Sequence, residues 1–212
     1  MPIFTETIFF DFDGVLVDSV DIKKHAFKNL FERFGQELSD QLVAYHQKYG
    51  GISRVKKIQY FFEHLLKQPL SRIELDIWCS RFSEKVKDAV INAPWIPGAE
   101  NFLKKYIGKI PMYIISGTPH SELTEIVLAR NMTHYLEGVY GSPTPKTEHV
   151  LNIIDQKNLS RKSCYFIGDA MTDYNTALET GLNFIGIQGE NKFPEDTSVF
   201  QDCNNLDQYI FH

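Results

Sequence analysis

The sequence predicts an α/β protein in which a parallel sheet carries a helical insertion after its first strand. Short apolar segments that end in polar residues, as buried parallel strands do, alternate with amphipathic helical patterns in the C-terminal part of the chain. The first apolar segment is separated from the second by roughly 100 residues, far more than one crossover helix needs. Most of this interval has a helical pattern, which indicates a separate helical unit.

The predicted strands are four short apolar segments: residues 8–12, 112–115, 165–167 and 184–187. Cys164 directly precedes the third of them, so we expect it on a buried strand. Apolar stripes predict helices around 102–107, 123–127, 150–154 and 177–178. Strands that alternate with helices in this way favour a parallel sheet with right-handed crossovers.

The inserted unit is expected to consist of three or four amphipathic helices that bury their stripes against one another. The stripes run over 27–34, 55–66 and 73–90, the last from Ile73 and Ile77 to Val90, with a short extra helix near 42–45. Gly50 and Gly51 interrupt the pattern, and the segment 93–98 is rich in turn residues and leads back to the sheet.

Composition excludes several classes of protein. The chain has 212 residues, 27 acidic and 22 basic side chains, and 43% apolar residues, so it is too apolar for a disordered protein and not basic enough for a generic nucleic-acid binder. No basic residue precedes Lys23, and Asp11 and Asp13 break the N-terminal apolar stretch, so we expect neither a signal peptide nor a membrane span. The three cysteines have no metal or redox spacing and are expected to be reduced thiols, as in a cytoplasmic protein. We expect a monomer or weak dimer. We expect no nucleic-acid or membrane partner.

Polar side chains gather at one edge of the predicted sheet. Ligands of open parallel α/β sheets bind outside the carboxyl ends of the strands. Asp11 and Asp13 are two positions apart at the end of the first strand, so they lie on the same face. The residues that the chain delivers to this edge are Asp11, Asp13, Ser116, Gly117, Thr118, Lys146, Asp169 and Asp173.

This set indicates a magnesium-dependent phosphate site. Clustered carboxylates repel one another without a cation, and Mg²⁺ prefers a few carboxylates, waters and a phosphate oxygen. Thr118-Pro119 and Thr144-Pro145 each look like a helix N-cap followed by proline at the first helical position. Both helices are expected to direct free N–H groups at a bound anion, and a lysine in the first turn, such as Lys146, suits an anion as its partner.

The same residues resemble the motifs of the haloacid dehalogenase superfamily. Asp11-Phe12-Asp13-Gly14-Val15-Leu16-Val17-Asp18-Ser19 resembles the first motif. Ser116, Lys146 and Gly168-Asp169-Ala170-Met171-Thr172-Asp173 resemble the second, third and fourth, in the right order. The helical insertion matches the cap of the phosphoglycolate phosphatase and β-phosphoglucomutase branch. The expected architecture is a Rossmann-like parallel-sheet core domain (1–16 and 95–212) with an inserted α-helical cap domain (17–94).

The resemblance implies a Mg²⁺-dependent phosphatase that acts on a small phosphorylated metabolite through a phosphoaspartyl intermediate. Asp11 is implied as the nucleophile and Asp13 as the acid/base group. The implied magnesium ligands are Asp11, the Asp13 carbonyl, Asp169 and Asp173, and the implied phosphate and substrate contacts are Ser116, Gly117, Thr118 and Lys146. A carboxylate nucleophile splits one difficult displacement into two easier ones, in agreement with this assignment.

Three positions need separate comment. Ser142-Pro143-Thr144-Pro145 aligns with a Lys-Pro-x-Pro pattern of this branch and puts serine where lysine is expected, whereas other members place the lysine at Lys146. We favour Lys146, because no other lysine or arginine lies between Arg130 and Lys157. Arg54 lies in a Gly-x-Ser-Arg segment that resembles a substrate-facing one and is a candidate for binding an anionic part of the substrate.

Lys23 aligns with a histidine of mutases, and this favours hydrolysis over a sugar-phosphate mutase, the nearest alternative. We otherwise expect Lys23 and Lys24 to be exposed on the first inserted helix. A dehalogenase is a third enzymatic alternative. It needs neither the second aspartate nor a metal, so the presence of Asp13 and Asp169 disfavours it. The alternative from another class is a non-catalytic, magnesium-dependent phospho-receiver module. Such modules carry no helical insertion, so the predicted insertion argues against one.

Overall fold

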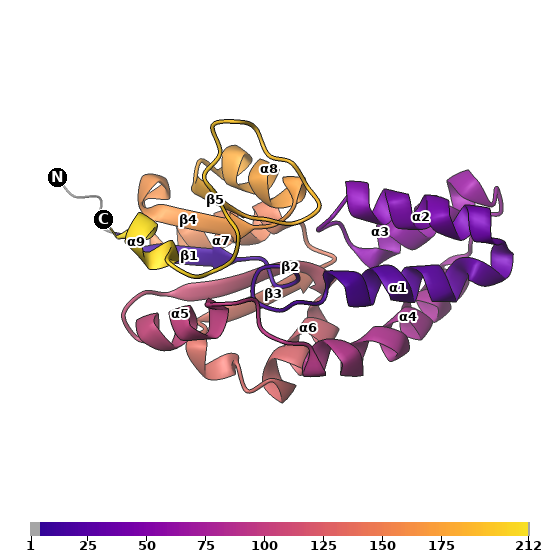
Figure 1. Cartoon of the computed structure of the whole chain (residues 1–212), viewed down its shortest axis with the longest axis horizontal. Coiled ribbons are helices and arrows are strands. Elements are labelled where there is room, and N and C mark those ends of the chain that lie inside the picture. The colour runs from indigo at the N-terminus through magenta and orange to yellow at the C-terminus, as the bar shows by residue number, and fades with distance from the viewer. Residues whose placement is uncertain (1–4, 212) are drawn as a thin grey trace.

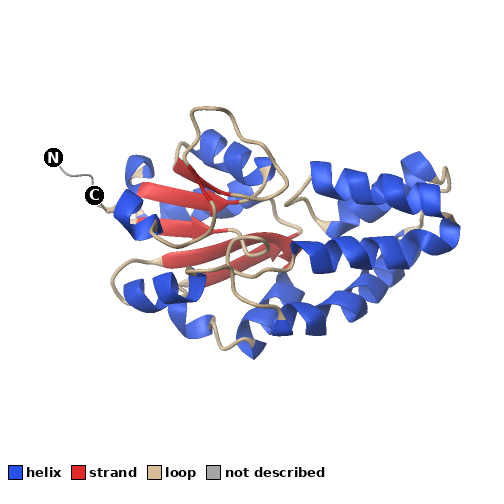
Figure 2. Ribbon diagram, in the orientation of Figure 1, coloured by secondary structure: helices blue, strands red, loops and turns tan. Residues whose placement is uncertain are grey.

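A six-stranded parallel sheet forms the centre of the computed structural model, which describes residues 5–211. The strands are β1 (Thr7–Phe10), β2 (Met112–Pro119), β3 (Gly138–Ser142), β4 (Cys164–Gly168), β5 (Asn183–Ile187) and β6 (Val199–Phe200). Their order is β3-β2-β1-β4-β5-β6, and every pairing is parallel (Figure 2). The predicted α/β class with a parallel sheet is confirmed.

Helices cover both faces of the sheet because its central strands are apolar on both sides. Ile8 and Phe10 pack with α5 (Ala99–Tyr106) and α6 (His120–Ala129) on one face. Phe9 points the other way, where its neighbours come from α7 (Lys146–Lys157) and α8 (Met171–Thr180). All three side chains are at most 1% exposed. β1 is therefore enclosed on both faces up to the point where the polar residues begin.

Four helices between β1 and α5 pack against one another beside the sheet (Figure 1). They are α1 (Val20–Phe31), α2 (Gln36–Lys48), α3 (Arg54–Tyr60), continued by a π-helical turn (Phe61–Leu65), and α4 (Arg72–Asn92). Aromatic rings fill the space between them, with Phe27 and Phe82 4.2 Å apart and Phe31 and Phe61 4.5 Å apart, centroid to centroid. Their arrangement supports the division into a core and a cap, which we keep as a proposal.

The remaining elements are short. Three 3₁₀ turns span Glu32–Phe34, Thr133–Tyr135 and Arg161–Ser163, and α9 (Leu206–Ile210) packs its Leu206 and Ile210 into the core. The thiols of Cys79, Cys164 and Cys203 are free, and Cys164 is buried on β4 as predicted. No helix in residues 5–211 combines the length and the apolar character that a membrane span requires.

Several details differ from the sequence-based expectation. Two strands, β3 and β6, were not expected, and α2 is a full helix of 13 residues and not a short one. Ile73 and Ile77 were expected in the buried stripe of α4 but are 74% and 46% exposed. A capping box, in which Ser71 and Glu74 bond to each other's backbone, starts the helix at Arg72. The buried residues of the helix begin only at Trp78, so its first turns extend beyond the core.

The two predicted Thr-Pro helix caps were each wrong by one residue. β2 continues through Pro119 and α6 begins at His120, while α7 begins at Lys146 with Pro145 at its N-cap. Both prolines have extended backbone, with ψ of 136° and 148°, because β2 and the segment after β3 remain strand-like up to them. The hydroxyl of Thr118 is therefore available for contacts other than helix capping.

Candidate active site

The carboxyl ends of three neighbouring strands bring the predicted residues together. β1 lies between β2 and β4 in the sheet. Asp11 follows β1, and its N–H donates to the carbonyl of Ile167 at 2.9 Å, which continues the β4 pairing. Ser116 lies on β2, and Asp169 follows β4. The strand order thus places these three side chains side by side, as expected.

Three buried carboxylates form the centre of the site. Asp11, Asp169 and Asp173 each offer an oxygen within 4.8 Å of the other two, and among residues 5–211 this is the group of side chains whose spacing suits a metal ion. Asp173 joins it from the first turn of α8, where its Oδ2 accepts a hydrogen bond from the N–H of Ala170 at 3.1 Å. The side chain of Asp173 is fully buried, so its charge has no access to bulk water.

Lys146 is the ammonium that faces this cluster. Its Nζ lies 2.6 Å from Oδ1 of Asp173 and 3.0 Å from Oδ1 of Asp11. Burial favours the neutral amine, but the charges of Asp11 and Asp173 outweigh it and raise the pKa of Lys146 above its ordinary value. Lys146 is therefore charged. Its buried side chain reaches the carboxylates from the first turn of α7.

One ammonium does not balance three carboxylates. Burial, together with the charges of Asp173 and Asp13, raises the pKa of Asp11 to about 7 even though Lys146 opposes the shift. Burial and the charge of Asp11 raise the pKa of Asp169 well above its ordinary value. Oδ1 of Asp11 is buried and makes no hydrogen bond, because its contact with Lys146 lacks hydrogen-bond geometry. An excess of buried carboxylate oxygens, one of them without a hydrogen bond, is the donor set that fits a hard divalent cation such as Mg²⁺.

Asp13 has a different environment from the other acids. Ser19 Oγ donates to its Oδ1 at 2.5 Å, Thr118 Oγ1 donates to its Oδ2 at 3.1 Å, and Lys23 Nζ donates to the same Oδ2. Burial alone raises the pKa of Asp13, but Lys23 and the two hydroxyls outweigh it and hold this pKa below its ordinary value. The turn that presents Asp13 needs Gly14, whose φ is +78° and whose N–H donates to Val17.

The expected exposure of Lys23 was wrong. Lys23 is 9% exposed, and its ammonium also donates to Thr118 Oγ1 at 2.8 Å. The reason is that α1 begins directly after the β1 loop, so its first turn faces the carboxyl end of the sheet. Lys24, one residue on, points outward to Asp21 and Glu190 and is half-buried.

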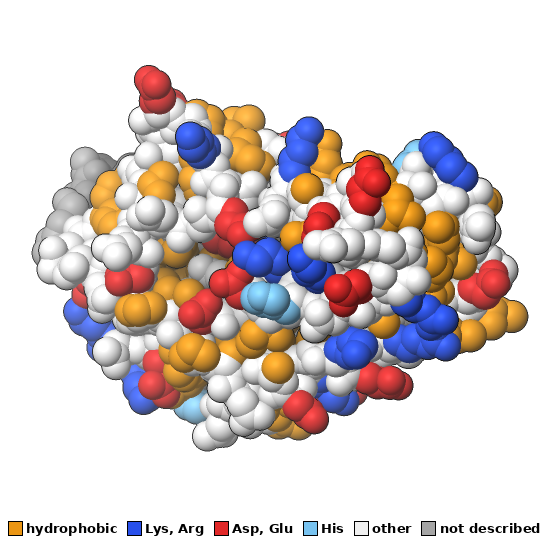
Figure 3. Space-filling view, turned by 45° about the vertical axis from the view of Figure 1, so that its right-hand side comes forward, with side chains coloured by type: hydrophobic (Ala, Val, Ile, Leu, Met, Phe, Trp, Pro, Cys, Tyr) orange, Lys and Arg blue, Asp and Glu red, His pale blue; other side chains and the backbone are white. Residues whose placement is uncertain are grey.

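A cavity of about 250 Å³ lies between the sheet edge and the inserted helices. In Figure 3, acidic, basic and histidine side chains gather in the middle of the face shown, between the two parts of the molecule. Gly117 belongs to the wall and lies close to the Gly51 carbonyl of the insertion. The sheet contributes Asp11, Asp13, Ser116 and Asp169, and the insertion contributes Lys23, Arg54 and Lys57. Lys146 pairs with Asp11 and Asp173 next to this wall, and its Nζ lies close to Gly51 of the insertion.

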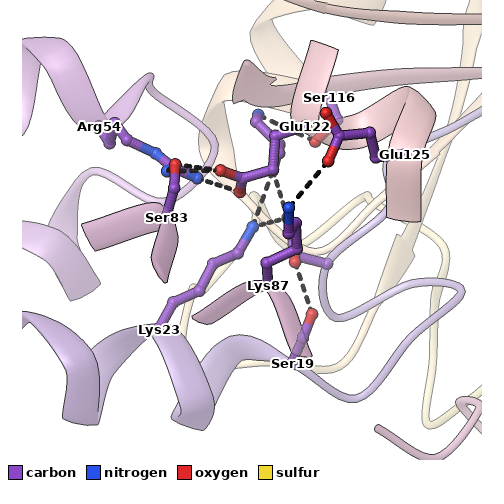
Figure 4. A network of polar contacts seen from close by, with 10 residues as sticks. Ser19, Lys23, Arg54, Ser83, Lys87, Ser116, Glu122 and Glu125 are labelled. Carbon is purple, nitrogen blue, oxygen red and sulfur yellow. Dashed lines mark hydrogen bonds and ion pairs between the residues drawn. The ribbon is translucent and has the colours of Figure 1, made fainter. Parts of the chain in front are cut away.

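Arg54 is already paired. Its Nη1 donates to Oε2 of Glu122 at 2.7 Å, its Nη2 contacts Oε1, and Ser83 bonds to both residues. Figure 4 shows the three side chains pointing toward one another from α3, α4 and α6. The side chains of Arg54 and Glu122 are 4% and 7% exposed, so the pair joins the insertion to the core away from water. Its role in substrate binding stays a prediction, since the guanidinium has this other partner.

Lys57 and His46 were not anticipated. Nζ of Lys57 lies 2.6 Å from Nδ1 of His46 in a buried contact, and both residues line the cavity. Lys57 follows Arg54 by three positions in α3, so the two lie on one helix face, and this spacing is the sequence signal that could have identified Lys57. His46 had no comparable signal, because its position depends on how α2 packs on α1 and α3.

One family model and several known proteins match this chain. The family model described as haloacid dehalogenase-like hydrolase matches residues 8–187. Among curated proteins, 6-phosphogluconate phosphatase of Escherichia coli (strain K12) is 23% identical over 184 residues, which are 84% of this chain and 80% of that protein.

Solved structures share the fold along nearly the whole chain. A predicted phosphoglycolate phosphatase from Haemophilus somnus 129PT has a TM-score of 0.76 at 16% identity, covering 97% of each chain. CbbY of Rhodobacter sphaeroides in complex with phosphate has a TM-score of 0.73 at 14% identity, covering 95% of this chain and 96% of that one. The YfnB protein of Bacillus subtilis, bound to magnesium, has a TM-score of 0.72 at 15% identity, covering 98% and 99%.

Proposed function

Because this chain belongs to the haloacid dehalogenase-like hydrolase family, we propose that it is a Mg²⁺-dependent phosphatase of a small phosphorylated metabolite. The observation that carries this proposal is the environment of Asp11. Its buried carboxylate follows the central strand and lines the cavity, and its Oδ1, next to Lys146, makes no hydrogen bond. Asp169, Asp173 and Lys146 surround it. The name of the E. coli relative, a phosphatase of 6-phosphogluconate, agrees with this activity.

Asp11 is the proposed nucleophile. Its carboxylate attacks phosphorus, an O–P bond to Asp11 forms, and the bond to the leaving alcohol breaks. Asp13 gives its proton to the leaving oxygen. In the second step Asp13 takes a proton from a water molecule that attacks the phosphoaspartate, which releases inorganic phosphate and restores the Asp11 carboxylate.

Asp13 suits both steps by its contacts. Ser19 and Thr118 fix the orientation of its two oxygens by hydrogen bonds. Its lowered pKa favours the carboxylate form, which the second step requires. The first step requires the protonated form, and Lys23 holds Oδ2 in place by a hydrogen bond.

Asp11, Asp169 and Asp173, with the main-chain carbonyl of Asp13, would hold Mg²⁺. The bound ion supplies positive charge that neutralises the phosphoryl oxygens. Ser116 and Gly117, on the cavity wall, are proposed to bind the phosphoryl group, while Thr118 acts through Asp13. Lys146 pairs with Asp11 and Asp173, so its proposed role is to balance their charge and orient Asp11.

Hydrolysis is preferred to the mutase alternative. A mutase has to return the phosphoryl group to a second hydroxyl of a rebound substrate. The position at which mutases of this branch are expected to carry histidine holds Lys23, whose ammonium is engaged by Asp13 and Thr118. Water is then the remaining acceptor for the phosphoaspartate.

The test is hydrolysis of p-nitrophenyl phosphate with Mg²⁺ and after complete chelation. Wild-type protein is expected to turn over only with the metal, and Asp11→Asn to be inactive under both conditions. Asp155→Asn, an exposed acid on α7, is the matched control and should keep wild-type activity. Activity that survives chelation would contradict the metal requirement.

A further inference from the structure

The ammonium of Lys57 is buried in the cavity wall without an acidic partner. Lys57 is 4% exposed, and within residues 5–211 no carboxylate forms an ion pair with it. Its polar contact is Nδ1 of His46 at 2.6 Å, and the ring of Phe27 lies 6.0 Å from Nζ. A buried ammonium normally has a carboxylate or several acceptors around it.

This arrangement is unfavourable in the absence of a ligand. Burial, with the nearby charge of Lys23, lowers the pKa of Lys57 to about 7. Burial and the charge of Lys57 lower the pKa of His46 to about 2, so the imidazole is neutral and accepts from the lysine. An anion placed against Nζ relieves the unfavourable burial, because it supplies the missing opposite charge.

The location of Lys57 matches the far end of a bound substrate. The phosphoryl-transfer groups Asp11 and Asp13 come from the sheet, whereas Lys57 and His46 come from α3 and α2 of the insertion. All of them line one cavity of about 250 Å³. A phosphate ester with its phosphorus at Asp11 extends its alcohol part toward the insertion.

The other cations of the insertion in this wall are engaged. Lys23 is bonded to Asp13, and Arg54 is bonded to Glu122. Among the described residues of the wall, Lys57 is therefore the cation of the insertion that is free to meet a substrate. It carries one charge, which matches a carboxylate better than the roughly double charge of a second phosphate.

We propose that Lys57, supported by His46, binds a carboxylate on the alcohol part of the substrate. The substrate class is then a small phosphate monoester that carries a carboxylate. This inference rests on the proposed phosphatase function and names the substrate of that same site.

Binding of non-hydrolysable analogues tests the inference without turnover. 3-Phosphonopropionate carries the carboxylate, and propylphosphonate has a methyl group in its place. Isothermal titration in the presence of MgCl₂ should show that wild-type protein binds the carboxylate analogue about 10- to 100-fold more tightly. Lys57→Met and Lys57→Gln should abolish this difference, while Lys56→Met, an exposed neighbour on α3, should keep it.

Three results would overturn the inference. Equal affinities of wild-type protein for the two analogues exclude a carboxylate subsite. A preference that persists in both folded Lys57 variants excludes Lys57 as its origin. Tighter binding of ethane-1,2-bisphosphonate than of 3-phosphonopropionate would assign the subsite to a second phosphate and not to a carboxylate. Folding of each variant is verified by thermal unfolding before titration.

Failure of the proposed function gives a different result. A protein that binds the carboxylate analogue through Lys57 but does not hydrolyse p-nitrophenyl phosphate lacks phosphatase activity and keeps the subsite. A protein that hydrolyses p-nitrophenyl phosphate but shows no carboxylate preference keeps the activity and lacks the subsite.

Discussion

Nζ of Lys146 lies 3.0 Å from Oδ1 of Asp11, and this ion pair is where the helix after β3 meets the end of the central strand. The same ammonium donates to Asp173 at 2.6 Å. Lys146 thus supplies positive charge to two of the three clustered carboxylates before any metal binds. The balance between this single ammonium and the carboxylates determines how the site responds to substitution.

Replacing Lys146 by methionine should destabilise the metal-free protein. Asp11 and Asp173 lose their buried counter-charge, and breaking such a pair costs about 3–5 kcal/mol. Because the ammonium no longer repels a cation, saturating Mg²⁺ should raise the melting temperature of Lys146→Met more than that of wild-type protein. Thermal unfolding with and without Mg²⁺ measures both effects. A metal-free variant that melts at the wild-type temperature would contradict the assigned charge balance.

The buried pair between Arg54 and Glu122 should contribute far more to stability than an exposed pair nearby. Arg54→Met leaves a buried carboxylate unpaired, with an expected loss of about 3–5 kcal/mol in the free energy of unfolding. The double variant Arg54→Met, Glu122→Leu should recover most of this loss. Urea unfolding measures each value.

Lys87 and Glu125 provide the control for that experiment. They form a 2.9 Å ion pair between α4 and α6, but their side chains are 41% and 60% exposed (Figure 4). Lys87→Met should change stability by less than about 1 kcal/mol, because water screens the pair. Similar losses for Lys87→Met and Arg54→Met would show that burial does not distinguish the two contacts.

Removing Lys57 should stabilise the protein in a pH-dependent manner. The pKa of Lys57 is lowered from 10.5 to about 7, so between these values the unfolded chain binds a proton that the folded chain has released. Wild-type stability at this group therefore rises with pH over that range, and the full cost of burying the ammonium remains below about pH 7. Lys57→Met should be more stable than wild-type protein by a few kcal/mol, roughly, at pH 6.

The difference between Lys57→Met and wild-type protein should shrink as the pH rises from about 7 toward 10. Lys23, Asp13, Asp169 and Lys146 also act on Lys57 and are present in both proteins, and His46, whose pKa Lys57 lowers, is neutral in both proteins over this pH range. Urea unfolding at several pH values, with exposed Lys56→Met as control, measures the difference. A constant difference across this range would show that Lys57 does not change its protonation on folding.

Gly117 is predicted to set the distance between the sheet and the insertion. A Cβ at this position would lie 2.1 Å from the carbonyl oxygen of Gly51, which is backbone and cannot rotate away. Gly117→Ala should therefore push the loop around Gly51 outward. A displacement of about 1 Å can reduce kcat/KM about 10²-fold. Steady-state kinetics on p-nitrophenyl phosphate measure the loss, and unchanged kcat/KM would mean that the loop does not need to close on β2.

The parts of the fold that sequence patterns predicted are those with a continuous apolar signal. Each of the four predicted strands contains a run of apolar residues, most of them buried: β1, β2, β4 and β5. β3 was missed because it is half-buried at the sheet edge and contains Gly138 and Gly141. The length of α2 was underestimated because two of its three buried positions are the polar residues Ser39 and His46.

The residues of the site also fall into two groups, those that sequence patterns predicted and those whose contacts they did not predict. Asp11, Ser116 and Asp169 were found from sequence because parallel strands deliver their carboxyl ends to one edge, whatever the details of packing. The contacts of Lys23 and Lys57 depend on how the insertion folds back over that edge, which no local pattern encodes. Lys23 therefore looked like an exposed helix residue and is a buried partner of Asp13.

The most direct test of the account is to trap the phosphoryl group on Asp11. Protein mixed with p-nitrophenyl phosphate and Mg²⁺ is quenched in acid within the first turnover, digested and analysed by mass spectrometry. The account predicts one added phosphoryl group on the peptide that contains Asp11, and none in Asp11→Asn. Rapid turnover without a labelled peptide, or Asp11→Asn turnover equal to wild type, would contradict the assignment of Asp11 as the nucleophile.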